Sequence, residues 1–144
     1  TTQLSILQKK SDVYSRQVAT SSCNQRDSRY FYTAVYLPSM GYVLPNCFFE
    51  ERKLFKVQKH ALRSFLAKCG FNRYTKRAIV FAPIRYGGCG FMHLYLLQGE
   101  GHIIQFLTHW RTNTMAGNLL RIAVSWVQLH LGISWFFLGN TVTP

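Results

Sequence analysis

The fold is indicated most clearly by residues 51–70, which read ERKLFKVQKHALRSFLAKCG. Apolar residues recur here at the spacing of an amphipathic helix: Leu54, Val57, Ala61, Leu62, Phe65 and Leu66. Four basic residues recur at steps of four, three and four: Arg52, Lys56, Lys59 and Arg63. At about 100° per residue these four fall within a wedge of about 60°, roughly opposite the apolar set. The stretch therefore predicts a helix with one side in a core and a row of cations facing outward.

The rest of the chain is also helical in pattern. Glu50 and Glu51 are expected to begin the basic helix, where acids complement the positive end of its dipole, and Gly70 to end it. Four further stretches have helical spacing: Leu4–Ala19, Tyr30–Tyr36, Phe91–Trp110 and Met115–Leu131. The aromatic residues of the second stretch are expected in the core more often than on a base-stacking surface. No stretch alternates with the period of a strand.

Breaks between the helices are predicted by capping residues, proline and glycine. Asp27 or Ser28 can cap the second helix, and Pro38 is expected to end or kink it. Residues 71–90 combine basic residues with Pro83 and a glycine cluster at 87–90, which predicts a loop with a tight turn. The expected fold is an all-α bundle of about five helices with a Gly/Pro-punctuated basic loop, in which residues 1–144 form a single helical module.

The charge of the chain predicts an anionic partner. Seventeen Lys and Arg residues face five Asp and Glu among 144 residues, which gives a net charge of +12. Ten of the seventeen lie between Arg52 and Arg85. Nucleic acid is the first expectation and an anionic membrane surface the second, because both present a dense array of phosphates. A solvated basic face without a dedicated partner is the remaining alternative.

Catalysis and metal binding are not expected. Two-metal or glycosidase chemistry needs convergent carboxylates, and the one close pair, Glu50 and Glu51, points about 100° apart on a helix. A Cys–His nucleophile pair stays open from sequence. The four cysteines form no Cys-x-x-Cys pair, and His102 with His109 lacks a third ligand, so neither a metal nor a cofactor is predicted. With no signal peptide evident, reduced thiols in an intracellular compartment are expected.

The C-terminal apolar segment has the length of a membrane span. It runs from Leu119 to Gly139 but contains Arg121, Gln128 and His130, which are costly in hydrocarbon. A helix buried on most sides of a soluble bundle is therefore predicted in place of a span. Four residues share its expected core face, with tryptophan as the anchor: Ile122, Ala123, Trp126 and Leu129.

A series of short phrases carries a family resemblance. They are Tyr36-Leu37-Pro38-Ser39, Leu44-Pro45, Gln58, residues 66–73 (LAKCGFNR), residues 77–83 (RAIVFAP), residues 87–91 (GGCGF), Gln98-Gly99, residues 109–111 (HWR) and Gly132-Ile133-Ser134. In this order they resemble the region downstream of the catalytic palm in reverse transcriptases of non-LTR, LINE-like retrotransposons. The resemblance runs over residues 28–134. Lys76, Ala82 and Cys89 depart from the family pattern, as they would in a degenerate copy.

The resemblance implies a thumb-like helical module that grips a template–primer duplex. The palm and its aspartates would lie upstream, in a parent protein that is an RNA-directed DNA polymerase. The chain begins Thr1-Thr2-Gln3, so a fragment of a longer polyprotein is expected. The upstream palm is then a partner of this module.

The predicted function is non-catalytic binding of an RNA or DNA backbone, at an intracellular and nuclear location. Phosphate contacts are expected from the basic helix through Arg52, Lys56, Lys59 and Arg63, and from the loop through Arg73, Lys76, Arg77 and Arg85. The alternative is a helical interaction module that docks on a membrane surface or a protein. It would use the apolar C-terminal helix with Trp126, Trp135 and Phe136.

Overall fold

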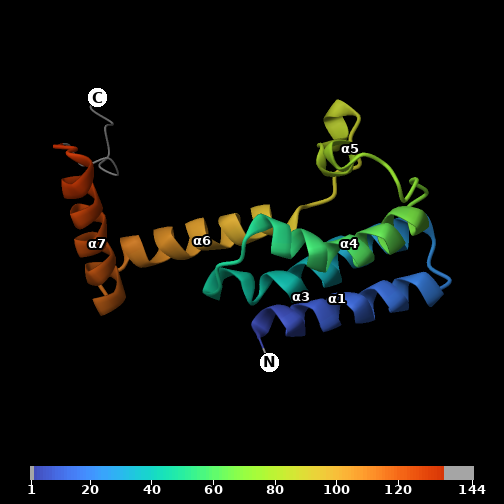
Figure 1. Cartoon of the computed structure of the whole chain (residues 1–144), viewed down its shortest axis with the longest axis horizontal. Coiled ribbons are helices and arrows are strands. Elements are labelled where there is room, and N and C mark those ends of the chain that lie inside the picture. The colour runs from blue at the N-terminus through green and yellow to red at the C-terminus, as the bar shows by residue number, and fades with distance from the viewer. Residues whose placement is uncertain (1, 135–144) are drawn as a thin grey trace. The chain divides into compact units, whose positions relative to one another are not determined.

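The computed structural model describes residues 2–134, and its regular structure there consists of helices without strands (Figure 1). The predicted all-α fold is confirmed. The chain divides into two compact units, Thr1–His102 and Ile103–Pro144. Each unit is described by itself.

The first unit contains most of the helices. Its α-helices are α1 Gln3–Thr20, α2 Gln25–Phe31, α3 Leu37–Gly41, α4 Glu51–Lys68, α5 Arg77–Phe81 and the first half of α6 Leu94–Arg111. A π-helical turn, Tyr32–Tyr36, joins α2 to α3, and 3-10 turns occur at Leu44–Asn46 and Ile84–Tyr86. The second unit contains the rest of α6 and α7 Met115–Leu131. The basic loop therefore carries a short helix and a 3-10 turn.

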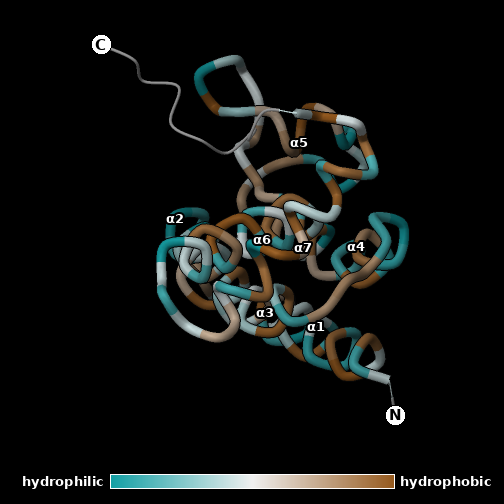
Figure 2. The backbone as a smooth tube through the Cα atoms, turned by 90° about the vertical axis from the view of Figure 1, so that its left-hand side faces the viewer, coloured by the Kyte–Doolittle hydropathy of each residue, from teal (hydrophilic) through white to brown (hydrophobic). Residues whose placement is uncertain are grey.

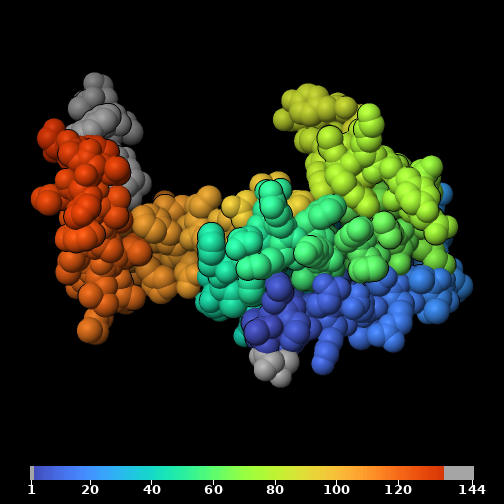
Figure 3. All heavy atoms as spheres, in the orientation of Figure 1, coloured from blue at the N-terminus to red at the C-terminus, as the bar shows by residue number. Residues whose placement is uncertain are grey.

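Helices α1 and α4 run parallel, side by side. Ser11 Oγ donates to the Val57 carbonyl at 2.8 Å, and directly after the last residue of α1 the Ser21 carbonyl accepts from Lys68 Nζ at 2.6 Å. Midway between them the hydroxyls of Ser15 and Ser64 lie 2.9 Å apart. Small serine side chains let the two backbones approach, and their atoms form one continuous surface in Figure 3. The tubes of α1 and α4 carry both hydrophilic and hydrophobic residues (Figure 2).

The side of α4 that faces the core is the predicted one. All six apolar residues of the expected set are buried, and Gln58 joins them. An aromatic cluster lies against this side: the ring of Tyr32 is 5.0 Å from that of Phe65 and 4.8 Å from that of Phe91. Tyr32 and Tyr36 are buried as predicted, whereas Tyr30 is exposed. Burial raises the pKa of Tyr36 to about 12, so the hydroxyl that pairs with Ser11 stays protonated at neutral pH.

The helix containing Pro38 continues past the proline instead of ending before it. The π-helical turn lengthens the hydrogen-bond step, so that the Leu37 amide donates to the carbonyl of Tyr32, five residues back. Pro38 then falls in the first turn of α3, where no amide donor is needed. The proline is thus accommodated at a change of helix register.

The capping residues are partly those expected. Asn24 caps α2, its side chain accepting from the Asp27 amide at 2.8 Å, so the prediction of Asp27 or Ser28 as the cap is wrong. Four residues in the loop before α2 are short and polar, and periodicity does not distinguish among them. Glu50 precedes α4, and Gly70 ends it with a φ of +79°, both as predicted.

Two buried glutamines form hydrogen bonds with the backbone of the segments that precede α4 and α6. Gln58 Nε2 donates to the Tyr32 hydroxyl at 2.9 Å and to the Met92 carbonyl at 2.7 Å, and its Oε1 accepts from the Leu94 amide at 3.2 Å. Gln98 accepts from the Phe49 amide at 3.1 Å and donates to the Phe49 carbonyl at 3.2 Å. Each side-chain amide therefore satisfies backbone groups that no helix pairs.

In the second unit, α7 is mostly exposed. Its buried residues are Gly117 and Gln128, and the predicted core anchor Trp126 is 63% exposed and stacks on His130. The predictions of a helix buried on most sides and of a buried Trp126 are therefore wrong. An apolar stripe reveals which side of a helix avoids water, but not whether another element covers it. Across the described residues, no helix combines the length and the apolar character needed to cross a membrane.

Candidate nucleic-acid interface

The four predicted residues on α4 form an exposed basic row. Arg52, Lys56, Lys59 and Arg63 are all exposed, on the side of α4 away from its buried residues. At a rise of 1.5 Å per residue the row is about 16 Å long. No acidic residue occurs between Arg52 and Arg85. Residues 2–134 make one ion pair, between Lys53 and Glu50 at 3.2 Å, so the charges of the row are not neutralised within the described chain.

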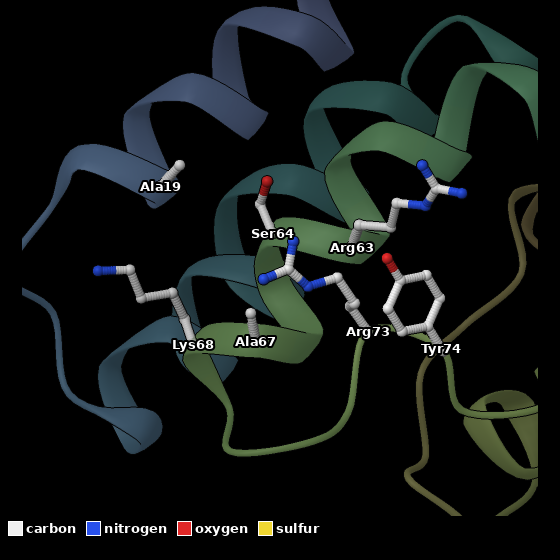
Figure 4. A pocket seen from close by; sticks show the side chains of 7 residues that line it. All are labelled: Ala19, Arg63, Ser64, Ala67, Lys68, Arg73 and Tyr74. Carbon is white, nitrogen blue, oxygen red and sulfur yellow. The ribbon is translucent and has the colours of Figure 1, made fainter.

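The C-terminal end of the row borders a pocket of about 310 Å³, here called the basic pocket. It is lined by Ala19 of α1, by four α4 residues and by the loop that follows: Arg63, Ser64, Ala67, Lys68, Arg73 and Tyr74. In Figure 4, Arg73 extends back across Ala67 toward Ser64, and the hydroxyl of Tyr74 points toward the stem of Arg63. Three basic residues thus contribute to the lining, with no acidic residue among the lining residues. The guanidinium of Arg73 lies over the centre of the view, whereas Arg63 and Lys68 extend to opposite sides (Figure 4).

Arg77 lies close to the row. Its guanidinium is 6.0 Å from the ring centre of Phe55 on α4, and its Nη1 is buried without a hydrogen-bond partner in the described chain. Burial lowers the pKa of Arg77, and the positive charge of Arg63 lowers it further. Two guanidinium groups that repel each other, one with an unsatisfied N–H, make a region where an anion would be stabilised.

Lys76 and Arg85 are exposed on the same loop, and no side-chain hydrogen bond or ion pair joins them to a residue of the row. The guanidinium of Arg85 lies 4.7 Å from the ring centre of Tyr86, its own neighbour. Neither side chain forms a hydrogen bond or ion pair with another residue in the part of the chain described. Of the predicted loop residues, the structure therefore brings Arg73 and Arg77 to α4.

The glycine cluster at 87–90 is a turn, as expected, and not an anion cradle. The amides of Gly88, Cys89 and Gly90 donate to the carbonyls of Pro83, Ile79 and Ala82 at 2.9–3.1 Å. A Cβ on Gly88 would lie 2.1 Å from the Ala82 carbonyl oxygen, so only glycine permits this approach. Because these three amides donate to backbone carbonyls, they are not available to bind an anion.

The prediction omitted two residues that line the basic pocket. Lys68 lies about 140° around α4 from Arg63, so helical spacing excludes it from the row. It reaches the pocket because α1 and the 71–74 loop close around that end of the helix. Tyr74, directly after Arg73, combines an exposed ring with a neighbouring cation, and that pairing was a usable signal in the sequence.

Metal ligands do not converge in the described part of the chain. No group of three or more His, Cys, Asp or Glu residues there is placed to hold an ion. His102 instead approaches the Cys47 carbonyl, with its Nε2 at 3.1 Å, and stacks on Phe48. All four cysteines are free thiols.

No family model, curated protein or solved structure matches this chain. The resemblance to the post-palm region of retrotransposon reverse transcriptases therefore rests on the quoted phrases and stays a prediction.

Proposed function

We propose that this chain is a non-catalytic helical module that binds the phosphate backbone of nucleic acid, in the manner of a polymerase thumb on a template–primer duplex. The observation that carries the proposal is the basic row: four exposed, unpaired cations in line on a helix whose other side forms the core. In this proposal an upstream palm supplies the chemistry, and the module works where its nucleic acid is, in the nucleus.

The length and rigidity of the row suit a duplex. Duplex DNA carries one charge per about 1.7 Å of axis, so roughly ten phosphates lie along the 16 Å of the row. The core side of α4 prevents the helix from rotating, which holds the four cations on one face at little conformational cost. Contacts of this kind neutralise phosphates without reading base edges, so RNA, DNA and hybrid duplexes are all candidate ligands.

The loop extends the charged face. Arg73 lies beside the C-terminal end of α4, and Arg77 lies against Phe55 in its N-terminal half. The buried Nη1 of Arg77 gains a partner if a phosphate oxygen approaches between Arg77 and Arg63. Lys76 and Arg85, at exposed positions on the same loop, would add two further phosphate contacts. The row and these four loop residues together are here called the track. The track then has up to eight phosphate contacts, of which four are held on one rigid helix.

The test is the salt dependence of binding to a duplex of mixed sequence. If at least the four residues of the row touch phosphates, log K should fall against log salt with a slope of about −3.6 or steeper. Fluorescence anisotropy of a labelled 20-base-pair duplex, measured from low to physiological salt, gives this slope. Affinity that does not change with salt, or no binding at low salt, would contradict the proposal.

A second function is favoured by the surface of α7. Five apolar residues spaced by four, three, four and three positions are each 57–80% exposed: Met115, Leu119, Ile122, Trp126 and Leu129. Such a stripe is typical of a helix that docks on an apolar surface, either a protein or the boundary of a membrane. Trp135 and Phe136, which the sequence also assigned to this role, lie outside the described residues.

Replacing Trp126 by alanine should separate the two functions. Because the indole is largely exposed, the free energy of unfolding should change by less than about 1 kcal/mol. Duplex affinity should be unchanged, whereas docking on vesicles or on a protein should weaken. Thermal denaturation, anisotropy with duplex and vesicle sedimentation measure the three effects. A loss of several kcal/mol would place Trp126 in a core, and a loss of duplex affinity would assign α7 to the nucleic-acid interface.

A further inference from the structure

We propose that the basic pocket binds a terminal phosphate monoester, the phosphorylated end of a nucleic-acid strand. This inference rests on the proposed backbone-binding function and assigns a distinct ligand to one end of the basic row. Two residues outside that row and track, Lys68 and Tyr74, are part of the site. The cations come from two segments: Arg63 and Lys68 from α4, and Arg73 from the loop that follows it.

The charge of the pocket favours a monoester over the diester of a continuous backbone. A diester carries one negative charge, whereas a monoester carries about 1.5 to 2 at neutral pH and offers three acceptor oxygens. Three cations line the pocket, and no acid lines it. A strand end therefore matches this part of the surface better than a phosphate within a strand, which is already matched by the single cations of the row.

The donors that the pocket needs are free. The side chains of Arg63 and Arg73 make no hydrogen bond to another described residue, and guanidinium groups can bind phosphate oxygens in a bidentate manner. Lys68 uses one donor on the Ser21 carbonyl, at 2.6 Å, and keeps two. That contact also anchors its ammonium group between α1 and α4.

The end of α4 does not cancel this charge. The C-terminus of a helix carries about −0.5 of a charge, against three full positive charges in the pocket. The last carbonyls of α4 are also occupied: Phe65 accepts from the Cys69 amide at 2.8 Å, and Leu66 accepts from the Phe71 amide at 2.8 Å. The field in the pocket therefore stays positive.

The shape of the pocket fits a nucleotide end. Its volume of about 310 Å³ is at the lower limit of small-molecule sites. Tyr74 forms one wall and is 77% exposed, so its ring is available to stack on a terminal base. A free phosphate would use the cations alone, whereas a strand end would use both the cations and the ring.

The test uses a DNA hairpin labelled in its loop, which has a single duplex end. The end carries a 5′-phosphate, a 3′-phosphate or hydroxyls only. The native chain should bind one or both phosphorylated hairpins about tenfold more tightly than the hydroxyl form, the gain expected from charge-assisted hydrogen bonds to one group. Equal affinities for all three hairpins would overturn the proposal.

Three variants identify the pocket as the source of this preference. Arg73→Gln and Tyr74→Leu should each reduce the preference toward unity. Arg111→Gln is the matched control, because it removes one exposed arginine that belongs neither to the pocket nor to the proposed phosphate contacts, and it should preserve the preference. Arg73 and Tyr74 are exposed, and circular dichroism checks that each variant is folded. A preference that survives both pocket variants would overturn the proposal.

Two further measurements separate the sources of phosphate and the two proposed functions. Inorganic phosphate, compared with chloride at equal ionic strength, should compete for the preference only weakly. If it binds as tightly as a phosphorylated hairpin, the site is one for free phosphate and the strand-end proposal is overturned. Covalently closed circular duplex has no ends, so failure to bind it contradicts backbone binding, whereas binding without any preference among hairpins contradicts only the pocket.

Discussion

The salt slope of duplex binding should shrink by about three to four units when the four residues of the basic row are replaced together by glutamine: Arg52, Lys56, Lys59 and Arg63. Each phosphate contact contributes about 0.9 to the slope through release of a bound counterion. Between 50 and 200 mM salt the native chain should therefore lose on the order of a hundredfold more affinity than the variant. Anisotropy titrations of both proteins with one duplex over that range give the two slopes.

The control for this variant removes exposed cations that lie off α4. Replacing Lys9, Arg26 and Arg111 by glutamine should change the slope by less than about one unit, because these residues are not in the row. All replaced side chains of both variants are exposed, so both should fold. Equal losses per charge in the two variants would mean that binding follows net charge alone. An unchanged slope in the folded row variant would remove α4 from the interface.

Replacing Gln58 by leucine should lower the free energy of unfolding by about 2–4 kcal/mol. The buried Leu94 amide would be left without its acceptor, at about 1–3 kcal/mol, and the Tyr32 hydroxyl would lose one of its hydrogen bonds, at about 0.5–1.5 kcal/mol. The Met92 carbonyl keeps its bond from Tyr32 at 2.7 Å, which limits the loss. Domains of this size are stable by about 5–15 kcal/mol, so the effect is a large share of the total. Urea denaturation followed by circular dichroism measures it.

A matched substitution and a local probe make this prediction specific. Gln17→Leu makes the same chemical change at an exposed position of α1 and should stay within about 0.5 kcal/mol of the native chain. In the Gln58 variant the Leu94 amide should exchange its hydrogen faster under native conditions, because its acceptor is gone. Equal stabilities of the two variants, with Leu94 still protected, would show that Gln58 is not the clamp between α4 and the start of α6.

The strongest sequence signals were local ones, and they predicted the helices well. The spacing of Leu54, Val57 and Phe65 identified the buried side of α4, and Gly70 ended α4 where expected. These features depend on residues within a few turns of each other, because backbone hydrogen bonds and helix ends are local. The exposure of the basic row followed from the same spacing, because residues on the side of a helix opposite its buried side face solvent.

Contacts between residues far apart in the sequence determine the features that helical spacing did not predict. Helical spacing places Gln58 between Leu54 and Leu62 on the buried side of α4, but it does not predict the partners of Gln58, which are Tyr32 and residues 92–94. The basic pocket likewise needs α1, α4 and the loop at residues 73–74 to meet. Whether the apolar side of α7 is covered is also a tertiary question, and in the described structure Trp126 is exposed.

The sequence by itself thus determined the all-α class, the approximate extents of the long helices and a row of cations on one of them. Only the tertiary structure decided that a helix passes through Pro38, which backbone groups two buried glutamines bond and that three basic residues line one pocket. Local hydrogen bonding and amphipathic spacing act within one helix, so the sequence contains them directly. The burial of a polar group or of a second apolar face depends on what packs there, which is set by residues far away along the chain.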